Sequence, residues 1–226
     1  MPAFIFNMNL TSRFIAWIGG TLLFVGLLLF ITFYAVNSSG ILSSQYFNTA
    51  IHEIANASTS SGGSLPLVGN SSNQNITRFL GGFNPDCNLL CLMQAPSTLP
   101  ISPSSFWLYQ LISEILAAAG AVLVFLAYAG GDKLAAIGKT SLSAAIISFV
   151  STYVPIAYLL PYLASSFNVH GFSIVIPASV TAPFTSVVLS LDITFAIAGV
   201  VLMVVGRIIF RKKAQASQPQ AQQFQN

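Results

Sequence analysis

Charge is what this sequence has least of. Asp, Glu, Lys and Arg make up only 6% of its 226 residues, whereas a soluble domain carries about 25%. Hydrophobic residues make up 54% of the chain, and its mean hydropathy is +0.77. A soluble domain of this composition could not keep its surface hydrated, so the shortage of charge excludes a soluble globular fold.

Histidine and cysteine are also scarce, with two of each. The sequence has no Ser-His-Asp set, phosphate-binding loop, HExxH motif or histidine pair on facing helices. Both histidines, His52 and His170, lie in segments predicted to be loops. The sequence therefore predicts a protein that is not an enzyme and that carries no metal or other cofactor.

Long apolar runs are what the sequence does have. Four runs reach the roughly 20 residues that a helix needs to cross a bilayer, at residues 14–36, 105–129, 142–163 and 185–206. The first run is longer than a signal-peptide core and has no small-x-small cleavage site, which favours an uncleaved span. We predict an all-α membrane protein: one four-transmembrane-helix bundle with a small extracytoplasmic cap, in which a β-strand is an alternative to irregular structure.

The basic residues predict the orientation, because Lys and Arg are enriched on the cytoplasmic side. Placing both termini inside puts every basic residue except Arg78 in the cytoplasm. The N-terminal arm 1–13, the turn 130–141 and the tail 207–226 are then cytoplasmic, and the loops 37–104 and 164–184 are extracytoplasmic. This arrangement predicts a multi-pass protein of the cell membrane.

The tail begins with a basic cluster and continues with Gln. The cluster consists of Arg207, Arg211, Lys212 and Lys213. Such a cluster is typical of a segment that stops transfer and that lies on anionic lipid, so no nucleic-acid partner is needed to explain it. Residues 214–226 contain six Gln and no charge, and we predict that they are disordered.

The two predicted outer loops carry signals of their own. Sequons in the large loop make a set of glycosylation candidates: Asn37, Asn56, Asn70 and Asn75. The stretch "QYFNTAIHEIANA" has apolar residues at helical spacing, which predicts a short amphipathic helix. In the second loop, "FSIVIPASV" is rich in β-branched residues and predicts a strand.

Cys87 and Cys91, in "CNLLC", are the only cysteines. Both lie in a predicted extracytoplasmic loop, where an oxidising compartment favours a structural disulfide, and one helical turn brings two Cα atoms within disulfide reach. The alternative is a redox-active pair that passes electrons to a quinone. Four-helix membrane thiol oxidases resemble this chain in span count, but their hallmark is C-x-x-C.

Two acids, Glu114 and Asp192, lie inside predicted spans that contain no basic residue. Both helices enter from the outer side, and each acid lies about 10–12 Å along its span at 1.5 Å per residue. Intramembrane acids usually face the bundle interior or a wet cavity. Three interpretations remain open: neutral acids that hydrogen-bond across helices, a cation or proton site, and a partner subunit that supplies a basic group.

The remaining features of the spans indicate close helix packing. Small residues lie on faces of span two (Ala117, Gly120 and Ala121) and span four (Ala196, Gly199 and Gly206), and small residues let backbones approach in lipid. Pro155 predicts a kink in span three.

Together these patterns predict a structural or assembly subunit, or a cell-envelope component. Its expected partners are the lipid bilayer and other membrane subunits or further copies of the chain. The alternative is a small membrane protein that handles electrons through Cys87 and Cys91, or protons or ions through Glu114 and Asp192.

Overall fold

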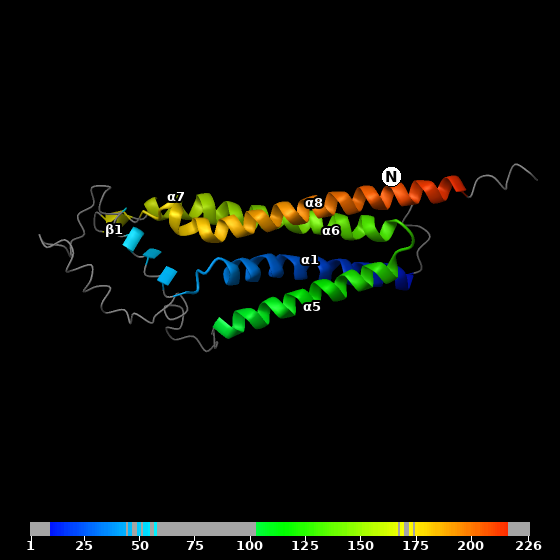
Figure 1. Ribbon diagram of the computed structural model, residues 1–226, viewed down its shortest axis with the longest axis horizontal. Helices are drawn as coiled ribbons and strands as arrows, with labels where there is room; N and C mark the ends of the chain where they lie inside the picture. The colour runs from blue at the N-terminus through cyan, green and yellow to red at the C-terminus, as the bar shows by residue number, and fades with distance from the viewer. Residues whose placement is uncertain are drawn as a thin grey trace, which may run out of the picture. The chain divides into compact units, whose positions relative to one another are not determined.

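The computed structural model describes residues 10–43, 45–46, 49–50, 52–54, 57, 103–166, 168–169, 172–173 and 175–216. Within these residues the chain is almost entirely helical (Figure 1). Four helices are long and apolar enough to cross a membrane: Leu10–Ser38, Phe106–Ala127, Asp132–Ser165 and Ala178–Ile209. The prediction of four long apolar helices is therefore confirmed for the described part of the chain.

Contacts divide the chain into two compact units. Unit 1 comprises Met1–Ile31, Gln110–Ser148 and Ser190–Asn226, and unit 2 comprises Thr32–Tyr109 and Phe149–Leu189. Each of the four long helices has one part in each unit.

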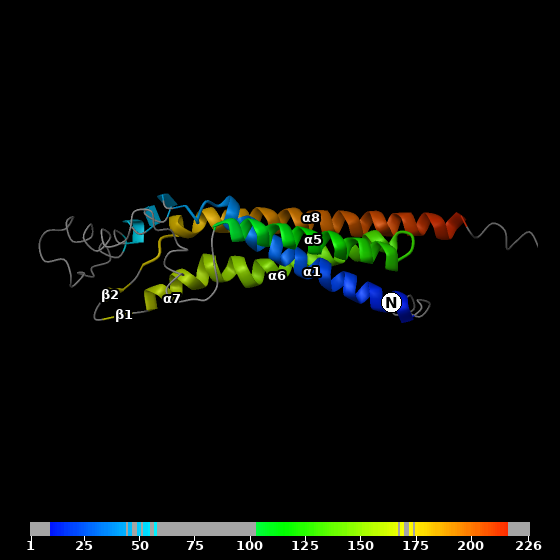
Figure 2. The same cartoon turned by 90° about the horizontal axis from the view of Figure 1, so that it is seen from below.

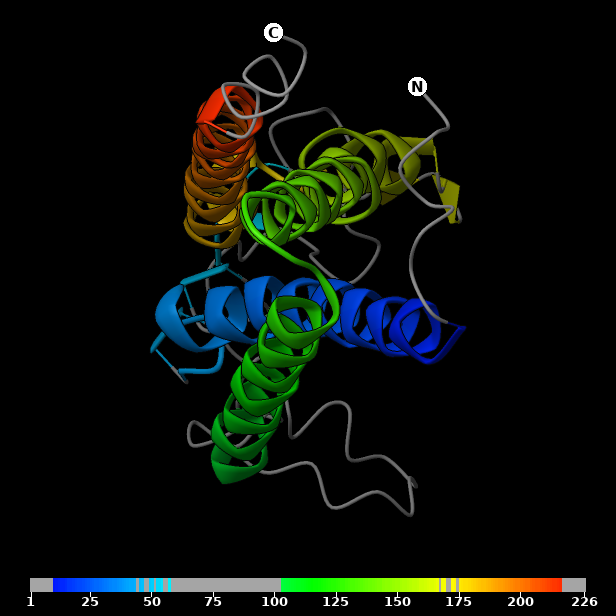
Figure 3. The same ribbon diagram turned by 90° about the vertical axis from the view of Figure 1, so that its right-hand side faces the viewer.

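In unit 1, helix α1 (Leu10–Ser38) packs against helix α5 (Pro103–Ala127) through glycines. A Cβ atom built on Gly120 would lie 2.2 Å from the backbone nitrogen of Leu23, and one built on Gly26 would lie 2.4 Å from that of Ala117. These contacts give the two helices an antiparallel register, and Figure 3 shows them crossing. Close approach supplies the dispersion contacts that hold helices together in lipid, where no hydrophobic force drives them together.

A second glycine-lined contact in unit 1 joins helix α6 (Asp132–Ser148) to helix α8 (Ala178–Ala216). A Cβ on Gly138 would lie 2.4 Å from the carbonyl oxygen of Gly199, and one on Gly206 would lie 2.5 Å from that of Gly131. The Ser141 hydroxyl donates a hydrogen bond of 3.0 Å to the backbone carbonyl of Phe195. The predicted small-residue faces at Gly120, Gly199 and Gly206 are thus packing surfaces.

The connection between α5 and α6 is shorter than the turn predicted over residues 130–141. Gly130 adopts a left-handed conformation (φ +59°), which glycine reaches without steric cost, and the chain is helical again from Asp132. An acid in the first turn interacts favourably with the helix dipole, and "KLAAIGK" consists mostly of good helix formers. Hydropathy misses this stretch because it reports apolar character and not helical backbone.

The third long helix changes its winding in unit 2. Two π-helical segments, η2 (Phe149–Tyr153) and η3 (Pro155–Leu159), are followed by α7 (Leu160–Ser166). Pro155 has no N–H to donate within the helix, and the N–H of Leu160 bonds to the carbonyl of Pro155, a five-residue π-type step. The structure thus places irregular winding on both sides of Pro155, and the kink itself stays a prediction.

Strand structure in unit 2 is limited, among the described residues, to one short ladder. Strands β1 (Asn168–Val169) and β2 (Phe172–Ser173) pair antiparallel. The strand predicted in "FSIVIPASV" is therefore present only at its first two residues, and α8 starts at Ala178 directly after Pro177. Proline is common at the start of helices because its missing N–H would have no partner there.

Helix α8 is longer than the predicted span 185–206 at both ends. It begins seven residues earlier and continues through the basic cluster to Ala216, as a single helix in both Figure 1 and Figure 2. Residues 214–216 are helical, so the prediction of disorder is wrong for these three residues; residues 217–226 lie outside the described part.

Candidate functional site

Asp192 is buried at the contact between α8 and α6 in unit 1. Asp192, Gly199 and Gly206 are spaced by seven residues, so they share one face of α8, and the two glycines touch the backbone of α6. The Asp192 side chain is only 4% exposed. The sequence prediction of an inward-facing acid is therefore what the structure shows at this position.

The Asp192 carboxyl lies close enough to the Ser148 hydroxyl on α6 to interact with it electrostatically. Nevertheless, neither carboxyl oxygen nor the Ser148 hydroxyl has a hydrogen-bond partner with good geometry among the described residues. Buried polar groups are nearly always paired, because an unpaired one costs about 1–3 kcal/mol. A proton shared between the two groups, or a bound cation, would satisfy these atoms.

Glu114 is placed differently, since it is exposed on the surface of α5. Its carboxyl oxygen accepts a hydrogen bond of 3.0 Å from the side-chain amide of Gln110, one turn earlier on the same helix. Glu114 therefore does not face the interior of the described helices, and the three interpretations of this acid stay predictions. The two acids lie at a similar depth by sequence, but one is buried between helices and the other faces outward.

Around Glu114, α5 presents a continuous outward stripe that we call the α5 outer face. It consists of Leu111, Glu114, Ala118 and Val122, which follow one another by three or four residues and are all exposed. Hydropathy alone did not identify this stripe, because every face of a membrane span is apolar. Only the burial of the opposite face, at Ser113 and Gly120, distinguishes it.

In unit 2, part of the predicted amphipathic helix contacts the start of α8. The described residues of this stretch are helical, the Tyr46 hydroxyl donates a hydrogen bond to the carbonyl of Val180, and the Ser179 hydroxyl donates one to the Glu53 carboxylate. Burial, followed by the nearby charge of Glu53, raises the pKa of Tyr46 above its usual 10.0. Sequence analysis missed this contact because its partners are 126 and 134 residues apart in the chain.

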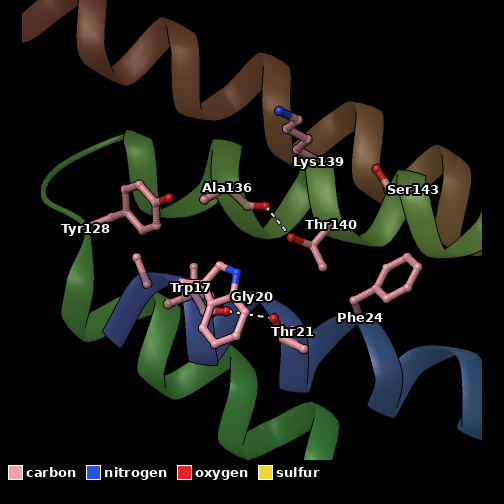
Figure 4. A pocket seen from close by; sticks show the side chains of 11 residues that line it. Trp17, Gly20, Thr21, Phe24, Tyr128, Ala136, Lys139, Thr140 and Ser143 are labelled. Carbon is pink, nitrogen blue, oxygen red and sulfur yellow. Dashed lines mark hydrogen bonds between the residues drawn. The ribbon is translucent and has the colours of Figure 1, made fainter. Parts of the chain in front are cut away.

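A pocket of about 420 Å³ lies in unit 1 between α1, α5 and α6 and opens onto the surface (Figure 4). Trp17, Thr21 and Phe24 line it from α1, and Val124 and Tyr128 from α5 and its end. Helix α6 contributes Lys139, which is the only charged residue among the described lining residues, together with small and hydroxyl side chains at Ala136, Thr140 and Ser143. This pocket could not be predicted from the sequence, because its walls come from three separate helices.

Several predicted site residues have little or no structural description. Cys87, Cys91, Asn56, Asn70 and Asn75 lie outside the described residues, so the disulfide and these sequons stay predictions. Asn37 lies in the last turn of α1, where its amide donates a 3.5 Å hydrogen bond to the carbonyl of Phe106.

The basic cluster lies on the last turns of α8. Arg207 is exposed, and the helix continues through Arg211, Lys212 and Lys213. The described residues contain no group of three or more His, Cys, Asp or Glu side chains able to hold a metal ion.

Comparison with known proteins gives no relative from which a role could be transferred. No protein family, curated protein or solved structure matches this chain. Any statement about its function therefore depends on the geometry of its own residues.

Proposed function

We propose that this chain is a non-enzymatic subunit of a membrane-protein complex in the cell membrane, with both termini in the cytoplasm, and that the α5 outer face binds its partner subunits. The observation that supports this proposal is the exposure of Glu114 near the middle of an apolar helix. An acid in the centre of a membrane helix costs about 2.5–3.5 kcal/mol. A docked partner would remove Glu114 from lipid and offset part of this cost.

The neighbours of Glu114 fit such an interface. Ala118, one turn away, is small and exposed, and small residues allow the close backbone approach that membrane helices need. The Gln110 amide and the Glu114 carboxyl together offer hydrogen-bond donors and acceptors to an incoming helix. Either another subunit or a second copy of this chain can supply the matching groups.

The test is the mass of the protein extracted from native membranes in mild detergent, measured by light scattering against the 24.0 kDa of one chain. We expect a larger complex for the wild type and for Glu114→Gln, which keeps hydrogen-bonding capacity. Glu114→Leu and Ala118→Leu should shift the mass towards a single chain. Ala198→Leu, at an exposed alanine of α8, is the matched control and should leave the complex intact. A wild-type protein that is extracted as single chains would contradict the proposal.

Proton or cation handling is a second candidate function, and the unpaired atoms of Asp192 and Ser148 favour it. If Asp192 exchanges a proton or binds a cation, the melting temperature of the purified protein should depend on pH or on the choice between sodium and choline salts. Asp192→Asn should abolish this dependence. Equal dependence in the wild type and the variant would assign Asp192 to helix packing alone.

A further inference from the structure

We propose that the pocket between α1, α5 and α6 binds the headgroup and the upper acyl chain of an anionic phospholipid. We call it the α1–α5–α6 pocket; Ala16 and Gly20 line it together with the residues given above. Its volume of about 420 Å³ is in the range of small-ligand sites, and it is open to the surface of unit 1.

The polar groups of the pocket are suited to an anion. Lys139 is the only charged lining residue, and neither its ammonium nor the Tyr128 and Ser143 hydroxyls makes a hydrogen bond or ion pair with any described residue. The Trp17 indole N–H is a fourth donor, and Figure 4 shows Trp17 and Tyr128 at the same end of the pocket. Ammonium, hydroxyl and indole groups are all donors to phosphate oxygens.

The same lining disfavours a zwitterionic headgroup and a free cation. Among the described residues that line the pocket there is neither Asp nor Glu, so none of these residues offers a carboxylate to a choline or ethanolamine group. Two further lining hydroxyls already donate hydrogen bonds within their own helices. The Thr21 hydroxyl donates to the carbonyl of Trp17 at 2.9 Å, and the Thr140 hydroxyl donates to that of Ala136 at 3.1 Å (Figure 4).

The apolar end of the pocket distinguishes a lipid from a free anion. Phe24 lies seven residues beyond Trp17 on α1, which is about 10 Å further along the helix. Trp and Tyr are typical of the membrane–water interface, and a lysine about two turns inside a helix extends its ammonium back towards that interface. The pocket therefore has interfacial aromatic residues at one end and Phe24 further along α1, and Lys139 lies on its α6 wall between Ala136 and Ser143 (Figure 4). An anionic phospholipid combines matching apolar and charged groups.

Trp17 provides a direct probe for this site. The chain has two tryptophans, so Trp107→Phe leaves Trp17 as the only one. This variant is reconstituted into vesicles of phosphatidylcholine that contain the same low mole fraction of brominated phosphatidylglycerol or brominated phosphatidylcholine, and quenching of Trp17 fluorescence is measured. We expect the anionic lipid to be preferred about fivefold, the factor that one interfacial cation contributes.

Matched variants separate the pocket from general surface charge. Lys139→Gln should abolish the preference and Lys139→Arg should keep it. Lys133→Gln should also keep it, because Lys133 stands 4.0 Å over the ring of Phe125 and does not line the pocket. Equal quenching by the two lipids would overturn the proposal, as would an equal loss in Lys133→Gln. Displacement of the brominated lipid by inorganic phosphate would also overturn it, because the ligand would then be a free anion.

Discussion

Replacing Gly120 by alanine should separate α1 from α5. The added Cβ would lie 2.2 Å from the backbone nitrogen of Leu23, 2.7 Å from its Cα and 2.8 Å from the carbonyl oxygen of Gly19. Ordinary contact begins near 3.4 Å, so the backbones must part locally by 3.4 − 2.2 = 1.2 Å. No side-chain rotation can relieve this clash, because all three atoms belong to the backbone.

The expected loss follows from two opposing effects. Overpacking costs about 1–3 kcal/mol, and a contact between backbones belongs at the upper end of that range. Alanine is a better helix former than glycine by about 1 kcal/mol. We therefore expect Gly120→Ala to lower the free energy of unfolding by about 2 kcal/mol.

Gly20→Ala is the matched control. Gly20 lies on α1, one of the same two helices, but a Cβ built there would meet nothing within 4 Å. This variant should be neutral or up to about 1 kcal/mol more stable, through helix propensity alone. The assay is reversible unfolding in mixed micelles by titration with sodium dodecyl sulfate, followed by circular dichroism. Equal stability of the two variants would refute the inference that backbone contact at Gly120 holds α1 to α5.

Two further predictions concern single hydrogen bonds. Ser141→Ala, which removes the bond to the carbonyl of Phe195, should lower the free energy of unfolding by about 0.6 kcal/mol in the same titration. Ser186→Ala is the control and should change the free energy of unfolding less, because Ser186 is exposed and its hydroxyl bonds within its own helix. A larger loss in Ser186→Ala than in Ser141→Ala would contradict the prediction. The raised pKa of Tyr46 favours the neutral phenol in the folded protein, so its contribution to stability is fully present below the unfolded pKa of about 10 and is lost as pH rises through the folded value. The melting temperature should therefore fall at alkaline pH in the wild type and less steeply in Tyr46→Phe, and parallel curves would exclude Tyr46 as the cause.

At the candidate site, the sequence predicted some properties of Glu114 and Asp192 but not their burial. Composition identified both acids and their similar depth, because depth follows from counting residues along a helix. It could not identify which acid is buried, since side chains on every face of these spans are apolar or small. The packing of Gly199 and Gly206 against α6 buries Asp192, whereas the residues of the α5 outer face are exposed and no described part of the chain covers them.

The helix ends show a similar division. The apolar runs located the four long helices, but α6 starts at Asp132 and α8 reaches Ala216. Backbone hydrogen bonding continues through charged residues such as Lys139 and through the basic cluster, where hydropathy falls. Periodicity also predicted the helical character of the stretch that contains Tyr46 and Glu53, but not its contact with α8.

By itself, the sequence determined that this chain forms four long apolar helices, because the shortage of charge and the length of the apolar runs are properties of single segments. Only the tertiary structure decided which glycines touch another backbone, which acid is buried and which donors surround the α1–α5–α6 pocket. These features depend on the register between helices that are distant in the chain. Small residues permit many such registers, and only close packing of the assembled helices selects one of them.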